Sequence, residues 1–117
     1  MVDKKPSGKS ARKAGATLAK SAGKGAVHVL SGGRPDAAEM SYGFALRRYK
    51  FTDHKSDPKD EAAAVTFHVS NAEAVSATAA PMAAMVEGVF FARDLTNEPA
   101  NVLTTDDFAA SCGSSKI

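Results

Sequence analysis

The sequence predicts an α/β fold that is incomplete on its own. Helical and strand patterns alternate along the chain, only two runs are rich in β-branched residues, and a long alanine-rich segment follows the second of them. The order helix, strand, helix, strand, helix is typical of α/β proteins, but two short strands without a third partner make a poor independent sheet. We therefore expect part of an α/β domain followed by a long helix.

A basic helix is predicted first. Residues 1–9 carry Pro, Ser and Gly among lysines and predict a flexible basic lead-in. Ser10 suits the N-cap of a helix over residues 11–22, and Gly23 suits its C-terminus. The apolar stripe expected on this helix is narrow and consists of Ala14, Leu18 and Ala22.

A strand and a second helix should follow. Residues 26–30 are apolar and β-branched, and the Ser-Gly-Gly after them indicates a turn. Pro35 then opens a helix, with Asp36 and Glu39 near its positive end. The residues expected to face inward are Ala38, Tyr42, Ala45, Leu46 and Tyr49. The basic residues Arg47, Arg48 and Lys50 complement the dipole at the other end.

The second strand and the long helix come after a charged loop over residues 52–61. Residues 64–69 alternate apolar and polar side chains, which predicts a half-exposed strand with Phe67 in the core. Asn71 should cap a helix reaching about Leu95, in which Pro81 either causes a kink or starts the second half. Its expected core stripe is Met82, Met85, Val86, Val89 and Phe90.

The last part of the chain predicts one more helix that barely begins. The long helix must end near Asn97, because the residue before Pro99 is disfavoured in the α region. Thr104 or Thr105 should cap the next helix, which has an acidic first turn. Residues 111–115, Ser-Cys-Gly-Ser-Ser, break the pattern, so this element is expected to be cut off.

No residue predicts catalysis or metal binding. The single cysteine, Cys112, excludes an internal disulfide and agrees with a reducing compartment. His28 lies within the first strand without a Cys, Asp or second His at metal-ligand spacing, so a core or surface role is favoured. Asp53 and His54 fall in the charged loop and are expected to be solvated. We therefore expect the chain to contain no catalytic residue, no cofactor-binding residue and no metal ligand.

Charge is distributed unevenly along the chain. Residues 1–24 hold seven basic groups and one acidic group, so the remainder is net acidic within an overall charge of +2. The basic groups are Lys4, Lys5, Lys9, Arg12, Lys13, Lys20 and Lys24. This basic arm is an alternative basis for function, as a small nucleic-acid-binding module, although no aromatic residues are interleaved with it. No apolar run suggests a membrane span or a signal peptide, so a cytoplasmic location is expected.

Residues 11–30, 36–55 and 87–103 each resemble a segment of the M17 leucyl aminopeptidase (cytosol aminopeptidase) family. The most specific part is residues 92–101, Ala-Arg-Asp-Leu-Thr-Asn-Glu-Pro-Ala-Asn, which resembles the junction leading into the family's catalytic domain. Residues 36–55 resemble a helix leading to a Tyr-x-Phe and a basic residue, and residues 11–30 are more weakly similar to a helix and strand of the non-catalytic domain. The resemblance spans about residues 10–110.

This resemblance implies a domain organisation. Residues 1–9 would be the lead-in, and residues 10–70 the C-terminal part of a macro-domain-like, non-catalytic N-terminal domain. Residues 71–97 would be the connecting helix, and residues 98–117 a truncated start of the catalytic domain with a tail. Arg93 and Asp94 are expected to pair with a neighbouring domain. Asn97 and Asn101 are expected to hydrogen-bond the turn fixed by Pro99.

The resemblance also implies an activity that this chain should lack. Family members are cytoplasmic hexamers that use two divalent ions, commonly zinc, manganese or magnesium, to activate a water and remove N-terminal residues from peptides. The family's metal residues surround an Asn-Thr-Asp-Ala-Glu-Gly-Arg motif that does not occur here, so no site residue transfers. A frameshift or premature stop in the gene is the explanation we favour for the absence of this motif and for the departure of residues 111–117 from the family's sequence. The other alternative is a regulatory fragment that binds full-length subunits through an exposed Met and Phe helix face.

Overall fold

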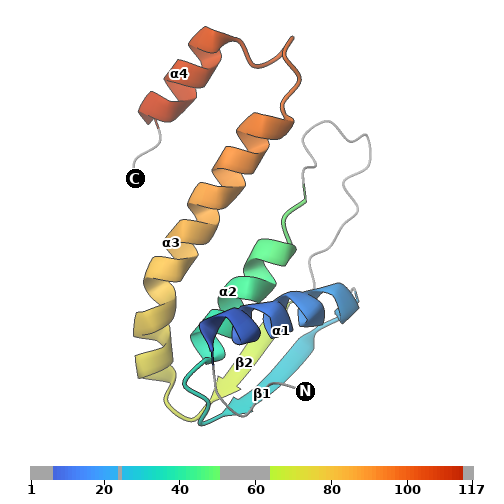
Figure 1. Ribbon diagram of the computed structural model, residues 1–117, viewed down its shortest axis with the longest axis vertical. Helices are drawn as coiled ribbons and strands as arrows, with labels where there is room; N and C mark the ends of the chain where they lie inside the picture. The colour runs from blue at the N-terminus through green and yellow to red at the C-terminus, as the bar shows by residue number, and fades with distance from the viewer. Residues whose placement is uncertain (1–6, 24, 51–63, 115–117) are drawn as a thin grey trace.

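The computed structural model describes residues 7–23, 25–50 and 64–114, which form four helices and two strands (Figure 1). Their order is α1 (Gly8–Ser21), β1 (Val27–Gly32), α2 (Ala37–Arg47), β2 (Val65–Val69), α3 (Ala72–Asn97) and α4 (Thr105–Ser114). The alternating pattern of the sequence is confirmed as a mixed α/β architecture. Residues 1–6 of the predicted lead-in and the loop over residues 52–61 lie outside the described residues. The lead-in, predicted over residues 1–9, was extended too far, because Gly8 and Lys9 belong to α1.

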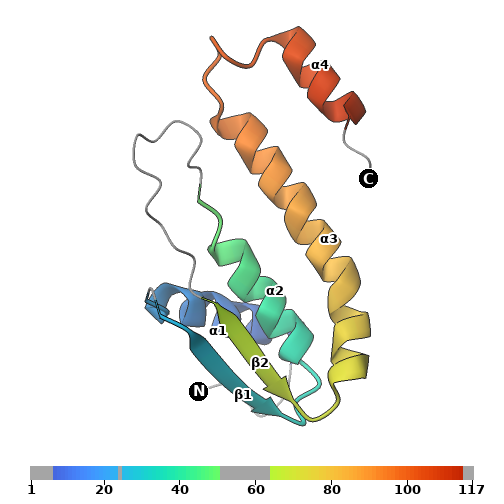
Figure 2. The same ribbon diagram turned by 180° about the vertical axis from the view of Figure 1, so that it is seen from behind.

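The strands pair in parallel and form the one sheet of the described residues. Val27 lies opposite Val65 and Leu30 opposite His68, with an irregularity before Gly32, whose φ of 55° is readily adopted only by glycine. Helices α1 and α2 cover one face, whereas no described element lies on the other face (Figure 2). The expected alternation of β2 is confirmed, since Phe67 is half-buried while Thr66 and His68 are exposed.

Helix α2 is the centre of the packing, because it contacts α1, α3 and β2. Phe44 on α2 is 6% exposed and meets Phe67 edge to face, with ring centroids 6.4 Å apart. The predicted inward face of α2 was partly wrong: Ala38 is buried, but Tyr42, Ala45, Leu46 and Tyr49 are only half-buried. The buried apolar residues of the described chain are Ala11, Ala37, Ala38, Met40, Phe44 and Val86.

Helices α1 and α2 cross at unusually short range, through two glycines. A Cβ atom on Gly15 would lie 1.9 Å from the carbonyl oxygen of Met40, and one on Gly43 would lie 2.1 Å from that of Arg12. The buried stripe of α1 is therefore Ala11 and Gly15, rather than one centred on Ala14, Leu18 and Ala22, which are half-buried. Absence of side chains lets the two backbones touch.

The starts of the first two helices differ from the prediction. Helix α1 begins at Gly8 because the hydroxyl of Ser7, rather than that of Ser10, caps it by accepting from the Ser10 N–H at 3.2 Å. Helix α2 begins at Ala37, two residues after Pro35. The Asp36 side chain makes no capping bond there, because Arg34 binds its carboxylate at 2.9 and 2.7 Å.

The Asp36 ion pair predicts a pH-dependent stability. Asp36 is 6% exposed, and the Arg34 hydrogen bonds are the main cause of its lowered pKa. Because the pKa of Asp36 is lower in the folded chain than its unfolded value of about 3.9, ionised Asp36 stabilises the fold at pH values above about 3.9. This stabilisation is lost as pH falls through the lower pKa of the folded chain. Asp36→Asn should thus cost about 1 kcal/mol at neutral pH, and the cost should disappear in acid, as pH falls through the lowered pKa of Asp36. Urea unfolding of both proteins at a series of pH values from neutral to acid tests this prediction. A destabilisation by Asp36→Asn that is independent of pH would contradict it.

Helix α3 is one long helix, as predicted, and Pro81 lies inside it. The Asn71 side chain accepts from the Ala74 N–H at 3.1 Å, which confirms the predicted N-cap, and the helix ends at Asn97 as expected before Pro99. In the expected core stripe Val86 is buried, Met82, Val89 and Phe90 are half-buried, and Met85 is 50% exposed. Contrary to the sequence interpretation, α3 is long and apolar enough to span a membrane by length and composition alone, which is weak evidence for a span.

Helix α4 is longer than expected, because it continues through Cys112 and Gly113 to Ser114 instead of breaking at Ser111. Its start is as predicted: Asp107 N–H donates to the Thr104 hydroxyl at 3.3 Å, and the Asp107 carboxylate accepts from the Thr104 N–H at 3.1 Å. The Thr104 hydroxyl also donates to the Asp107 carboxylate at 2.5 Å, and this bond, followed by the one from the Thr104 N–H, lowers the pKa of Asp107. Helix α4 lies beyond the end of α3 (Figure 1), and its Phe108 is 48% exposed.

Candidate functional site: the junction between α2 and α3

The C-terminal ends of α2 and α3 are joined by a group of side chains around Tyr49. This Tyr49 cluster consists of Tyr49, Phe90, Arg93, Asp94 and Asn97. Four of the five come from the last two turns of α3, which place them on the side facing α2, while Tyr49 follows α2 directly. The spacing Phe90, Arg93, Asp94, Asn97 keeps them on one helical face.

The geometry of the Tyr49 cluster is closely specified. The Tyr49 hydroxyl donates to Asp94 Oδ1 at 2.7 Å and accepts from Asn97 Nδ2 at 3.0 Å. The ring of Tyr49 contacts the ring of Phe90, with centroids 5.2 Å apart, and the guanidinium of Arg93 lies over the Tyr49 ring, 5.3 Å from its centroid. One hydroxyl is thus used both as a donor and as an acceptor, which fixes the position of α3 along α2.

Arg93 adds a second link between the helices. Its Nη1 donates to the carbonyl oxygen of Leu46 at 3.0 Å. Leu46 lies in the last turn of α2. That carbonyl has no partner within the helix, so the guanidinium both satisfies it and complements the negative end of the dipole. The backbone of α2 and the side chains of α3 are therefore bonded to each other.

The Tyr49 hydroxyl keeps its proton at neutral pH. The pKa of Tyr49 is raised, first because the hydroxyl is partly removed from water and then because it donates to Asp94. Tyr49 can therefore donate to Asp94. The polar side chains of the cluster are bonded to one another or to α2, which suits a role in positioning a helix.

The structure gives the most specific motif its partners. Arg93 and Asp94 form pairs with Leu46 and Tyr49, which lie in the predicted domain of residues 10–70, next to the connecting helix, so this agrees with the expected pairing. Asn97 bonds Tyr49 and not the turn at Pro99. That turn is closed by its own backbone, since the N–H groups of Val102 and Leu103 donate to the Pro99 carbonyl at 2.9 and 3.0 Å. Asn101 is exposed.

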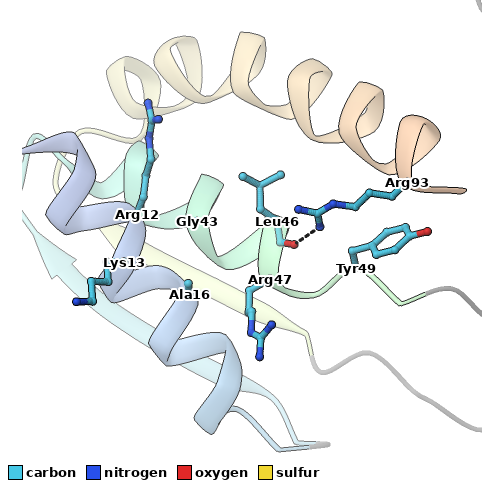
Figure 3. Close-up of a pocket in the computed structure, with 8 residues that line it drawn as sticks. All are labelled: Arg12, Lys13, Ala16, Gly43, Leu46, Arg47, Tyr49 and Arg93. Atoms are coloured by element: carbon cyan, nitrogen blue, oxygen red, sulfur yellow. Dashed lines mark hydrogen bonds between the residues drawn. The ribbon is translucent and has the colours of Figure 1, made fainter. Parts of the chain in front are cut away.

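A basic hollow of about 590 Å³ lies beside the Tyr49 cluster, between α1, α2 and the end of α3 (Figure 3). Its cationic residues are Arg12, Lys13, Arg47 and Arg93. Figure 3 shows the side chains of Arg12, Lys13 and Arg47 extending in different directions rather than toward one point. Arg12 is also paired with Glu39 and stacks on Tyr42, 5.1 Å from the ring centroid. This arrangement gives the nucleic-acid alternative little support.

The remaining candidate residues are dispersed, with one exception. Cys112 is exposed on α4, and Asp53, His54, Lys4, Lys5 and Lys24 lie outside the described residues. Among residues 7–23, 25–50 and 64–114, no three His, Cys, Asp or Glu side chains gather as metal ligands. The exception is His28, whose expected isolation is wrong, because His68 of the neighbouring strand lies beside it. Strand pairing, which the sequence spacing does not reveal, brings them together.

Comparison with known proteins yields one consistent group of relatives. The chain is 54% identical over 101 residues to a probable cytosol aminopeptidase of Cereibacter sphaeroides, covering 86% of this chain and 21% of that protein. It is 46% identical over 99 residues to one of Dinoroseobacter shibae, covering 85% and 20%, and 38% identical over 103 residues to one of Methylorubrum populi, covering 81% and 21%. No family model matches the chain, and no solved structure matches it.

The relatives define the class: they are all probable cytosol aminopeptidases, and the chain spans about a fifth of their length. The chain belongs to the M17 leucyl aminopeptidase family, as the junction motif of residues 92–101 implied. Three residues of this motif, Arg93, Asp94 and Asn97, are the ones that join α3 to α2.

Proposed function

We propose that the chain is the connecting section of a leucyl aminopeptidase, which holds a long helix against a small α/β unit and thereby orients the part of the enzyme that performs hydrolysis. The parent enzyme would remove N-terminal residues from peptides in the cytoplasm with two divalent ions, zinc, manganese or magnesium. Those ions would be bound by residues of the parent enzyme that this chain does not contain. By itself the chain is inactive.

The observation that carries this proposal is the Tyr49 cluster. The motif with the strongest family resemblance contributes three of its residues, and all three bond α2 or Tyr49 rather than an open site. A catalytic motif would instead present unpaired carboxylates or an open ligand position. The same side chains fix the direction in which the backbone leaves α3, because Asn97 is its last residue and Glu98 is already extended.

The form of the α/β unit agrees with this role. Parallel sheets are normally covered on both faces, yet the sheet of β1 and β2 has a face on which no described element lies (Figure 2). We therefore regard residues 10–70 as part of a larger, macro-domain-like domain in the parent enzyme. We further propose that the parent enzyme assembles into hexamers and that this chain binds its full-length subunits.

An activity assay tests the proposed absence of catalysis. The purified chain is incubated with leucine 4-nitroanilide and Mn²⁺ or Zn²⁺, with the Cereibacter sphaeroides relative as the positive control. We expect no metal-dependent release of nitroaniline from the chain, because no described side chains form a two-metal cage. Release that increases with the amount of chain and is abolished by a chelator would overturn the proposal.

A further inference from the structure

The uncovered face of the sheet carries two histidines, one from each strand. His28 on β1 is paired in register with Thr66, so His68 on β2 lies two residues further along and on the same side. His28 Nδ1 and His68 Nε2 are 3.1 Å apart, and the two rings are stacked with centroids 5.4 Å apart. Both side chains are exposed, so solvent and solutes reach them.

The distance between the two nitrogens has two physical explanations. In the absence of a cation, one nitrogen carries a hydrogen and donates it to the lone pair of the other. Alternatively, both lone pairs bind one cation. With a metal–nitrogen bond of about 2.0 to 2.1 Å, two ligands of the same ion lie about 2.9 Å apart at a right angle and about 3.3 Å apart at a tetrahedral angle. The 3.1 Å separation lies between these values.

We propose that His28 and His68 form a binding site for a borderline divalent cation such as Zn²⁺ or Cu²⁺, which takes the place of the hydrogen that the two rings share. That hydrogen moves to the other nitrogen of its own imidazole ring, so both rings stay neutral and both facing nitrogens offer a lone pair. Imidazole suits these ions, whereas Mg²⁺ and Ca²⁺ prefer oxygen ligands. No third His, Cys, Asp or Glu of the described chain joins the two histidines. Water completes the coordination, so affinity is lower than at a closed site with three or four protein ligands, and Cu²⁺ binds more tightly than Zn²⁺.

A bound cation would also join β1 to β2. Because the two ligands come from different strands, the ion binds the folded chain and has no equivalent site in the unfolded one. Stability should consequently increase with the concentration of free Zn²⁺, which provides a readout that is independent of enzymatic activity.

The test is calorimetric titration of the untagged chain with ZnCl₂ and CuSO₄, compared with His28→Asn and His68→Asn. His54→Asn is the matched control, since it removes the third histidine of the chain, and Cys112→Ser removes the thiol. Far-UV circular dichroism confirms that each variant folds. We expect one ion per chain, affinity lowered about tenfold or more by either sheet variant, and no change in the two controls.

Thermal unfolding with and without Zn²⁺ provides the second measurement. The melting temperature of the parent chain should rise with Zn²⁺, and that of the His28→Asn, His68→Asn double variant should not. Unchanged cation affinity in the sheet variants overturns the proposal, as does loss of binding in His54→Asn or Cys112→Ser. So does the absence of measurable Cu²⁺ binding to the parent chain.

Discussion

Gly43→Ala should lower the free energy of unfolding by about 3 kcal/mol and release α1 from α2. The new methyl group would lie 2.1 Å from the Arg12 carbonyl oxygen and 2.7 Å from its carbonyl carbon. Both are backbone atoms, so no side-chain rotation can relieve the overlap, and the helices have to separate. Separation would uncover Ala11 and weaken the contact between Arg12 and Glu39.

Gly88→Ala is the matched control for this prediction. Gly88 lies inside α3, and nothing would lie within 4 Å of its new Cβ atom. Alanine should therefore raise stability there by about 0.5 to 1 kcal/mol, through its higher helix propensity. Urea unfolding of both variants provides the measurement. Equal changes of either sign in the two variants would show that α1 and α2 do not cross in the way described.

Tyr49→Phe should lower the activity of an intact aminopeptidase that contains this chain, although Tyr49 takes no part in the chemistry. The host is the Cereibacter sphaeroides relative, in which the matching segment of 101 residues is replaced by that of this chain. Loss of the hydroxyl removes the bonds to Asp94 and Asn97 and leaves the end of α3 free to shift. Displacements of about 1 Å can cost about a hundredfold in rate, so we expect kcat to fall about tenfold or more.

Tyr42→Phe in the same chimera is the control, because it removes a tyrosine hydroxyl from α2, seven positions before Tyr49. Tyr42 contacts Arg12 through its ring, which phenylalanine retains. We expect kcat to be unchanged in this variant and metal content to be unchanged in both. If Tyr49→Phe and Tyr42→Phe have the same kcat, the Tyr49 cluster does not orient the catalytic part.

Local signals in the sequence were sufficient to predict most of the elements. The Asn71 cap, the stop before Pro99 and the alternation of β2 depend on neighbouring residues, and each is confirmed. The crossing of α1 and α2 was not predicted, because it depends on which glycine meets which backbone. Glycines inside two helical patterns were the available signal, since an isolated glycine in a helix often marks a close approach.

The candidate site was less predictable for the same reason. Tyr49 and Asp94 are 45 positions apart, and His28 and His68 are 40 apart, so neither pair can be identified without the packing of helices or the register of strands. The motif of residues 92–101 was recognised as specific, and a structural role was favoured for it. The partner of Asn97 was assigned wrongly, because a sequence pattern does not show which neighbour a helix faces.

The most direct test of the central claim is the rate of leucine 4-nitroanilide hydrolysis by the unsubstituted chimera. If the chain is a connecting section of an M17 aminopeptidase, its segment should replace that of the relative and retain metal-dependent hydrolysis within about tenfold of the parent rate. A chimera that folds and binds metal normally but does not hydrolyse the substrate would contradict that claim.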